Sequence, residues 1–287
     1  MTTLAIRGIP LGIDFLGGTE MQVRFDNPVD VSEIRSLMDN SGFSGMEIKT
    51  MGTPTDILLR TPMQEEGTVV AERIQSALNQ KFSQTNNFKV QRTDKVGPKI
   101  GSELRQNAIL AVVFSLIGIL IYLAFRFQFV YAFGAVVALF HDVLITVSAV
   151  ALFDAFLPIQ LEFSQTMLAA FLTLIGFSVN DTVIIFDRIR ENIKIHKNED
   201  ILHVMNRSVN ATLSRTIITS GTVFLTVLVI FIFGGEVLRS FSFTFGVGII
   251  TGTYSSVFVA SAIVVDWKNR VLKNRSTSST GKVVLNK

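Results

Sequence analysis

The sequence predicts a multi-pass α-helical membrane protein with a small α+β domain in front of its helices. Hydrophobic residues make up 48% of the 287 residues and charged residues only 17%, whereas soluble domains carry about 25% charged residues. Residues 1–100 are nearly neutral and polar, with 11 Lys and Arg against 12 Asp and Glu. Five long apolar segments follow. These observations exclude a wholly water-soluble protein.

Residues 1–100 predict one domain with alternating strands and helices. Residues 19–26 alternate between apolar and polar side chains like a half-buried strand. Asp30, followed by Glu33 three residues later, is typical of a capping box at a helix start. The expected strands are 19–26, 45–51, 56–61 and 87–95, and the expected helices are 31–40 and 65–82. This β-α-β-β-α-β order predicts a ferredoxin-like fold.

The membrane domain is expected over residues 101–266. A helix needs roughly 20 apolar residues to cross ~30 Å of hydrocarbon, and a helix satisfies its own backbone hydrogen bonds there. Gly97 and Pro98 interrupt the chain just before this domain, so we expect a hinge at that point. The predicted spans are 107–125, 129–153, 163–186, 211–234 and 241–265.

Basic residues predict the orientation of the spans, because cytoplasmic loops carry an excess of Lys and Arg. Arg126, the 188–215 connection and the tail 267–287 are basic, whereas the loops 154–162 and 235–240 are mainly acidic. The α+β domain is therefore expected outside and the C-terminus inside. Since residues 1–18 contain neither a signal peptide nor a span, we expect an upstream helix to be missing, through truncation or a misplaced start codon.

The composition also excludes several kinds of chemistry. The absence of cysteine rules out disulfides, thiolate zinc sites, iron–sulfur clusters and Cys nucleophiles. Three histidines argue against a His-rich metal site, and no nucleotide-binding loop is present. We therefore expect neither an enzyme nor a cofactor or metal, and no binding of nucleic acid.

Polar residues inside the predicted spans are the candidate functional residues. A charged side chain at mid-helix costs roughly 2.5–3.5 kcal/mol on an insertion scale, so such residues usually face other helices or water. Asp181 lies in the inner half of its helix and Arg215 near the inner end of the next, so an ion pair between them is geometrically possible. We expect Asp181 to alternate between a protonated form and an ionised form paired with Arg215. Such a pair could also serve only to hold two helices together. His141 and Asp142 lie near the middle of the second span.

Two helical stripes accompany these residues. Arg215, Thr219, Thr222 and Thr226 share one face of a helix and could line a hydrated path or bind neighbouring helices. Gly248 and Gly252 form a small-xxx-small pair, which indicates close helix packing.

Several motifs resemble those of SecF proteins in the SecD/SecF family. Gly12–Thr19 (GIDFLGGT) resembles the family's GIDFTGGT motif, and Gly176–Asn192 (GFSVNDTVIIFDRIREN) resembles its GYSLNDTVVVFDRIREN signature. Three shorter matches have the same order: Val96–Leu104 resembles VGP-x-VG-x-EL, His141–Val143 resembles HD-V, and Arg215–Ser220 resembles RT-x-x-TS. Leu16, Phe177 and Val179 replace the usual Thr, Tyr and Leu without changing a titratable position.

The resemblance implies a six-helix subunit of the RND permease superfamily whose first helix precedes the periplasmic domain. It implies that the subunit pairs with SecD in the bacterial inner membrane and works on unfolded preproteins with SecYEG, with YajC and YidC as further partners. It also implies that the proton motive force drives this work, with sodium as an open alternative. Carried over from the family, Asp181 and Arg215 belong to the proton pathway. The other candidates for that pathway are Asn180, Asp142, His141 and Thr219.

Two other functions remain to be weighed. An RND-type small-molecule exporter would share the architecture and the ion coupling, but only residues 235–240 are available for its second large external domain. An intramembrane aspartyl protease would need a carboxylate dyad such as Asp142 and Asp181. The sequence around Asp181 lacks the GxGD motif of those proteases, and Arg215 would hold one carboxylate charged.

Overall fold

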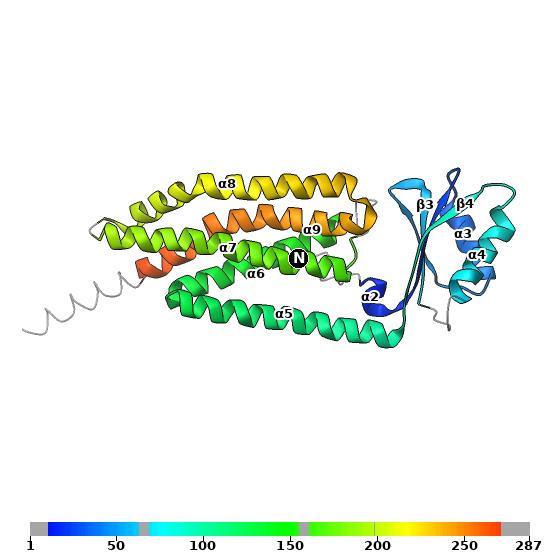
Figure 1. Cartoon of the computed structure of the whole chain (residues 1–287), viewed down its shortest axis with the longest axis horizontal. Helices are drawn as coiled ribbons and strands as arrows, with labels where there is room; N and C mark the ends of the chain where they lie inside the picture. The colour runs from blue at the N-terminus through cyan, green and yellow to red at the C-terminus, as the bar shows by residue number, and fades with distance from the viewer. Residues whose placement is uncertain (1–10, 63–68, 155–160, 198, 271–287) are drawn as a thin grey trace, which may run out of the picture. The chain divides into compact units, whose positions relative to one another are not determined.

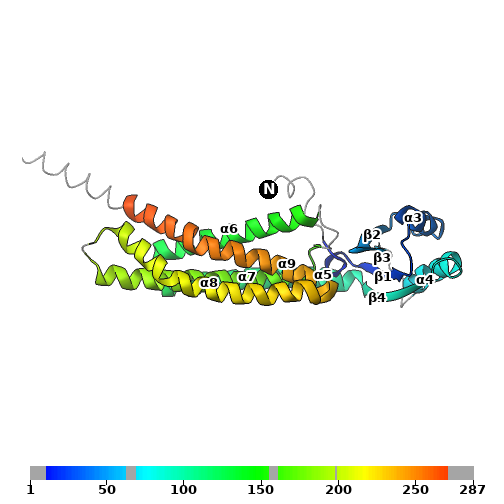
Figure 2. The same cartoon turned by 90° about the horizontal axis from the view of Figure 1, so that it is seen from above.

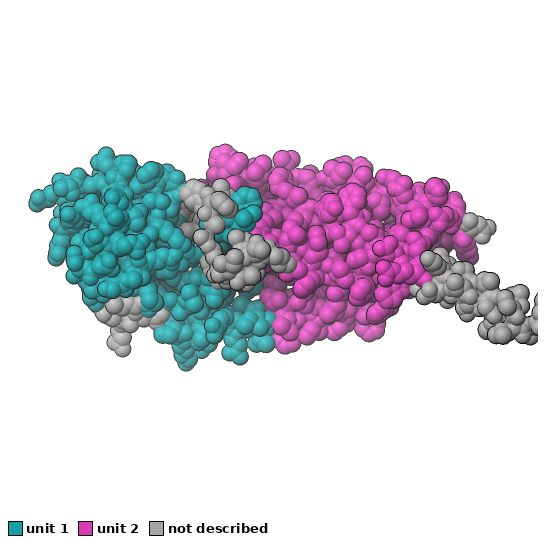
Figure 3. Space-filling view, turned by 180° about the vertical axis from the view of Figure 1, so that it is seen from behind, with its two compact units in different colours: residues 1–111, 151–168 teal, residues 112–150, 169–287 magenta. Residues whose placement is uncertain are grey.

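The computed structural model describes residues 11–62, 69–154, 161–197 and 199–270 (Figure 1). The expectations for residues 1–10, 65–68, 155–160 and 271–287 lie outside the described residues. Figure 3 shows two compact units, residues 1–111 with 151–168 and residues 112–150 with 169–287. The first unit is larger than the predicted domain 1–100, because the start of the first long helix and residues 161–168 pack with it.

A four-stranded antiparallel sheet forms the centre of the first unit. Its strands are β1 Gly18–Phe25, β2 Glu47–Met51, β3 Thr53–Thr61 and β4 Phe88–Val96. The strand order is β2-β3-β1-β4, with Met21 opposite Leu59 on one side and Thr93 on the other. Helices α3 Val31–Asn40 and α4 Val69–Phe82 lie on the same face of the sheet (Figure 1). This arrangement confirms the ferredoxin-like fold. We call residues 18–96 the sheet domain.

The alternation of side chains along the strands decides which face is covered. Met21 and Val23 of β1 belong to the core beneath the helices, together with Ile34 of α3 and Ile74 of α4. Their neighbours in sequence point to the opposite face, as period-two strands require. The predicted cap forms in part: the Asp30 side chain accepts a hydrogen bond from the Ser32 backbone N–H at 2.9 Å. Here, however, the partner of Glu33 is Lys81, at 3.2 Å.

Two successive glycines connect the short helix α2 Ile13–Leu16 to β1. Gly17 and Gly18 have φ values of 76° and 139°, which L side chains rarely adopt. A Cβ on Gly18 would also lie 2.6 Å from the Thr61 carbonyl oxygen. Gly101 of the next helix also lies close to this turn, since a Cβ there would lie 3.1 Å from the Gly17 nitrogen. Larger residues cannot occupy this turn without moving the backbone.

Within the described residues, five helices are long and apolar enough to cross a membrane, which confirms the predicted fold class. They are α5 Pro98–Arg126, α6 Phe129–Asp154, α7 Gln165–Ile195, α8 Ile201–Phe233, and the span Leu238–Arg270 that begins in α9 Gly235–Tyr254. Several helices extend beyond the predicted spans, because polar residues continue the helices past their apolar parts. Pro98 is the first residue of α5, where its missing N–H costs nothing. The hinge at Gly97 and Pro98 stays a prediction.

The membrane helices pack around an apolar core in the second unit. Tyr131 of α6, Phe186 of α7 and Val264 after α9 are buried in it. Figures 1 and 2 show α8 and α9 side by side. α9 continues without a break into a π-helical turn, η1 Ser255–Ala260, within the same membrane span. α5 contributes least to the core, with Phe114 66% and Phe125 91% exposed.

Candidate intramembrane polar site

Asp142 of α6 is the first carboxylate of the site and is completely buried. The Ser178 hydroxyl of α7 donates to its Oδ2 at 2.5 Å. The Nδ1 atom of His141 lies 3.1 Å from its Oδ1. The imidazole is one-third exposed, so a residue open to the surface adjoins a carboxylate with no exposure.

Asp181 of α7 is the second carboxylate and is 6% exposed. The Thr216 hydroxyl of α8 donates to Oδ1 at 3.1 Å, and the Ser256 hydroxyl of η1 donates to Oδ2 at 3.0 Å. Each carboxylate oxygen therefore has one hydroxyl partner from a different helix. Because Ser178 precedes Asp181 by three positions, both lie on the same face of α7. That face presents Asp181 itself and the partner of Asp142 to the neighbouring helices.

Close packing of α9 on α7 makes these contacts possible. A Cβ on Gly248 would lie 2.6 Å from a methyl group of Leu174, and a Cβ on Gly252 would lie 3.2 Å from the Cβ of Ser178. The Gly252 position is also 3.7 Å from Asp142 Oδ2. Gly252, one of the small residues predicted to serve in packing, thus lies beside Asp142 and its partner Ser178.

The π-helical turn supplies Ser256 to this site. π turns insert one extra residue into a helix and occur frequently at functional sites. The Ser256 hydroxyl also lies 3.0 Å from the Thr253 carbonyl oxygen, so this single hydroxyl can donate either to its own helix or to Asp181. One carboxylate partner therefore comes from an irregular segment of backbone.

The expected ion pair between Asp181 and Arg215 does not form in this structure. Arg215 is exposed, and within the described ranges it makes neither an ion pair nor a hydrogen bond. The helical phase explains the difference, because Thr216, one residue later, is the side chain of α8 that turns toward Asp181. Arg215 lies on the outer stripe with Thr219, Thr222 and Thr226, all of which are exposed.

The sequence-based candidates and the observed site overlap only in part. Asn180 and Thr219 are exposed, and neither is among the described partners of the two carboxylates. Conversely, sequence reasoning missed four hydroxyl residues that contact the site or extend it: Ser178, Thr216, Ser220 and Ser256. A usable signal was present, since Ser208, Thr212, Thr216 and Ser220 repeat every four residues along α8 and are all buried.

The site is suited to holding and releasing protons. A carboxylate accepts hydroxyl donors when ionised and can itself donate when protonated, and a hydroxyl can do either. Among the residues that the structure describes, no group of three His, Asp or Glu side chains could hold a metal ion. The site contains two buried carboxylates with hydroxyl and imidazole partners.

Comparisons with known proteins match nearly the whole chain. The family described as protein export membrane protein SecD/SecF, C-terminal, matches residues 74–270, and the SecD/SecF GG motif matches residues 2–29. The chain is 45% identical to the protein translocase subunit SecF of Rhodothermus marinus, covering 96% of this chain and 89% of that protein. Its identity to the SecF subunit of Calditerrivibrio nitroreducens is 43%, covering 90% and 84%.

A solved structure resembles the chain as well. The crystal structure of SecDF from Thermus thermophilus, a translocon-associated membrane protein, has a TM-score of 0.81 and 37% identity to it. The match covers 93% of this chain and 36% of the SecDF chain, so this chain spans about a third of that protein's length.

Proposed function

Because this chain belongs to the SecD/SecF family of protein export membrane proteins, we propose that it is a SecF-type subunit that assists Sec-dependent protein translocation. With SecD it would use the proton motive force to move proteins across and into the cytoplasmic membrane. The chain is a multi-pass membrane protein, and its homologues are named translocase subunits. That name describes a transport component rather than an enzyme that alters its substrate.

One observation carries the coupling part of the proposal: Asp181 is buried where α7, α8 and η1 meet, with hydroxyl donors to both oxygens. Uptake of a proton would remove a charge from the middle of three helices and change which of these hydrogen bonds can form. Moving one charge through 100 mV supplies roughly 2.3 kcal/mol. That is enough to shift the balance between two packings that differ by a few kcal/mol.

The outer stripe of α8 supports the partnership with SecD. An Arg exposed on a membrane helix is costly in lipid, and such residues usually face other helices or water. Arg215 and Thr219 would thus be covered by a partner helix carrying a carboxylate. On this view the proton pathway runs between the two subunits, with Asp181 and Arg215 as its main groups and with Asp142 and His141 beside it.

The remaining partners and the location follow from the same proposal. The sheet domain would lie in the periplasm and meet unfolded preproteins, and the basic segment 188–215 would lie in the cytoplasm. SecYEG would be the channel served, with YajC and YidC as further associates. Protons are the proposed coupling ion, and an assay without sodium separates the two ions.

Asp181→Asn tests the proposal in inverted membrane vesicles that contain the full chain and SecD. The variant keeps the size of the side chain but cannot ionise, so we expect loss of the gradient-driven part of export while ATP-driven export and assembly with SecD continue. Asp187→Asn is the matched control, because Asp187 lies on the same helix and pairs at 2.5 Å with Arg126 at its exposed end. Normal gradient-driven export by Asp181→Asn would refute the coupling mechanism.

The small-molecule exporter is not favoured. The relatives that cover most of this chain are named translocase subunits, and the solved relative is described as translocon-associated.

A further inference from the structure

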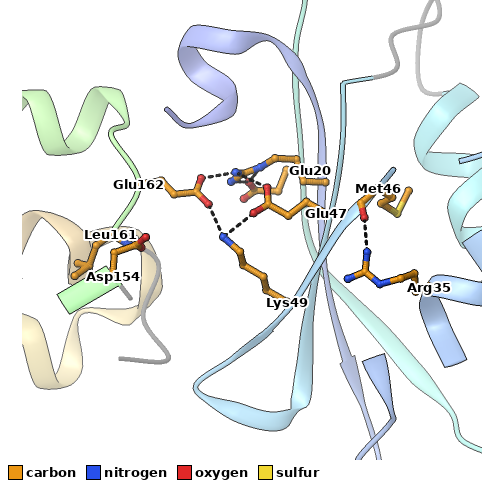
Figure 4. Close-up of polar contacts among 9 residues, drawn as sticks. Glu20, Arg35, Met46, Glu47, Lys49, Asp154, Leu161 and Glu162 are labelled. Carbon is orange, nitrogen blue, oxygen red and sulfur yellow. Dashed lines mark hydrogen bonds and ion pairs between the residues drawn. The ribbon is translucent and has the colours of Figure 1, made fainter. Parts of the chain in front are cut away.

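The chain just before α7 is bound to the uncovered face of the sheet by an ionic cluster (Figure 4). Glu162 is 7% exposed, and its Oε2 pairs with Nη1 of Arg60 on β3. Its Oε1 lies 3.4 Å from Nζ of Lys49 on β2. Arg60 also binds Glu20 of β1 at 2.6 Å and Glu47 of β2 at 3.2 Å. Side chains from β2 and β3 therefore hold one carboxylate that precedes α7, and a carboxylate from β1 holds Arg60.

Residues 12–15 make further contacts with the same segment. The Phe163 carbonyl accepts a hydrogen bond from the Gly12 N–H at 3.0 Å, within a short parallel bridge. The Asp14 carboxylate accepts one from the backbone N–H of Gln165, the first residue of α7, at 2.9 Å. The ring of Phe163 lies 5.9 Å from that of Phe15. We call the contacts of Glu162, Phe163 and Gln165 the α7 clamp.

The charges of the cluster favour a lasting attachment. Burial lowers the pKa of Arg60, but the charge of Glu162 and the hydrogen bond to Glu20 outweigh it, so the pKa lies above its ordinary value. Arg60 is therefore always a cation. Because a buried charge that loses its partner is strongly destabilising, opening the α7 clamp would be costly.

We propose that Arg60 and Glu162 are positioning residues of a permanent clamp that passes movements of α7 to the sheet domain. α7 is one unbroken helix from Gln165 to Ile195, and Asp181 lies about 24 Å from its start at 1.5 Å per residue. A shift of the helix caused by Asp181 reaches its clamped end directly. The inference rests on the proposed function and adds a second connection to the one through Gly97 and Pro98.

Glu162→Ala tests the clamp in vesicles with the full chain and SecD. We expect the gradient-driven part of export to fall roughly threefold or more, in line with mutations along coupling networks, while ATP-driven export is unchanged. Asp56→Ala is the matched control, since Asp56 pairs with Arg24 on the same face of the sheet at 2.5 Å and accepts a hydrogen bond from Thr53, and both partners lie outside the clamp segment. Unchanged gradient-driven export by Glu162→Ala would overturn the proposal.

An engineered disulfide tests whether export needs only the attachment of this segment or the Glu162 carboxylate itself. A Cβ on Gly12 would lie 3.8 Å from the Cβ of Ser164, the usual separation across a disulfide, and Gly12 has an ordinary φ of −74°. The chain has no other cysteine. Gly12→Cys with Ser164→Cys should export normally when oxidised. In the Glu162→Ala background, oxidation should restore the gradient-driven part of export, and reduction should remove it again.

Two results would count against a permanent clamp: loss of export on oxidation in the otherwise unchanged chain, and failure of oxidation to rescue Glu162→Ala. The first would mean that the clamp must open, and the second that the carboxylate itself is needed. Asp181→Asn is measured in parallel. If that variant couples normally, the proposed function fails whatever the clamp variants do.

Discussion

Two groups of buried carboxylates in this chain are partnered in opposite ways. On the sheet, Glu20 and Glu162 share the cation Arg60. In the helix bundle, Asp142 and Asp181 have hydroxyl partners, and among the described residues only His141, which is charged only when protonated, could offer a cation within ion-pair distance. A carboxylate with a permanent cation is held in place by an ion pair, whereas one with only hydroxyl partners keeps no fixed counter-charge when it gains or loses a proton. The first arrangement suits attachment and the second suits switching.

Removing the cation should have the largest effect. Arg60→Met leaves Glu20 and Glu162 buried without their main partner, and breaking such a pair typically costs about 3–5 kcal/mol. We expect that loss of stability in the sheet domain of the purified full chain, seen as faster amide hydrogen exchange along β1 and β3.

Asp142→Asn is the contrasting variant. The amide oxygen still accepts from Ser178, and no permanent cation loses its partner, so the change should cost less than about 1 kcal/mol. Equal costs for the two variants would break the comparison.

Loss of one hydroxyl should have an intermediate effect. Ser256→Ala removes the donor to Asp181 Oδ2, and a hydrogen bond to a charged group contributes about 1.5–3 kcal/mol. We expect gradient-driven export to fall by roughly tenfold while the chain still assembles with SecD. Ser255→Ala is the control, because the neighbouring hydroxyl donates to the Gly252 carbonyl at 3.2 Å and, among the described residues, not to Asp181. The same loss in both variants would mean that the π turn, not the contact with Asp181, matters.

The smallest expected effect is on the pH dependence of stability. Glu162, which binds the sheet, and Asp56 on β3 should contribute to it in opposite directions. Burial raises the pKa of Glu162 above 4.5, so its stabilising contribution is complete below pH 4.5 and is lost as the pH rises through its raised pKa. The hydrogen bond from Arg24 lowers the pKa of Asp56 below 3.8, so its contribution is present above pH 3.8 and is lost as the pH falls through its lowered pKa.

Glu162→Gln should therefore flatten the pH dependence of unfolding above pH 4.5, and Asp56→Asn should flatten it below pH 3.8. Denaturant unfolding of the full chain at a series of pH values measures both. Identical pH profiles for the two variants would contradict this assignment.

Local patterns made much of the fold predictable. Alternation in β1 and the cap at Asp30 depend on neighbours in sequence, and the structure contains both. The partners of Asp181 were harder to predict. Arg215 and Thr216 are adjacent and point about 100° apart around the helix axis, so the choice between them depends on how α8 is rotated in the bundle. The pairing of Glu162 with Arg60 could not be predicted from the sequence, since these residues lie far apart in it and meet only once the sheet has formed.

The π turn also governs the phase of the last span. Six residues of the last span, spaced four apart, face α7 or α6. The contacts are Gly248 with Leu174, Gly252 with Ser178, Ser256 with Asp181, Ala260 and Val264 with Gly134, and Lys268 with Tyr131. In a plain α-helix each four-residue step overshoots a full turn by about 40°, so the stripe would drift by about 200° over this length. The extra residue of the π turn sets the phase back by about 100° and cancels half of that drift. A single stripe of residues can thus follow first α7 and then α6.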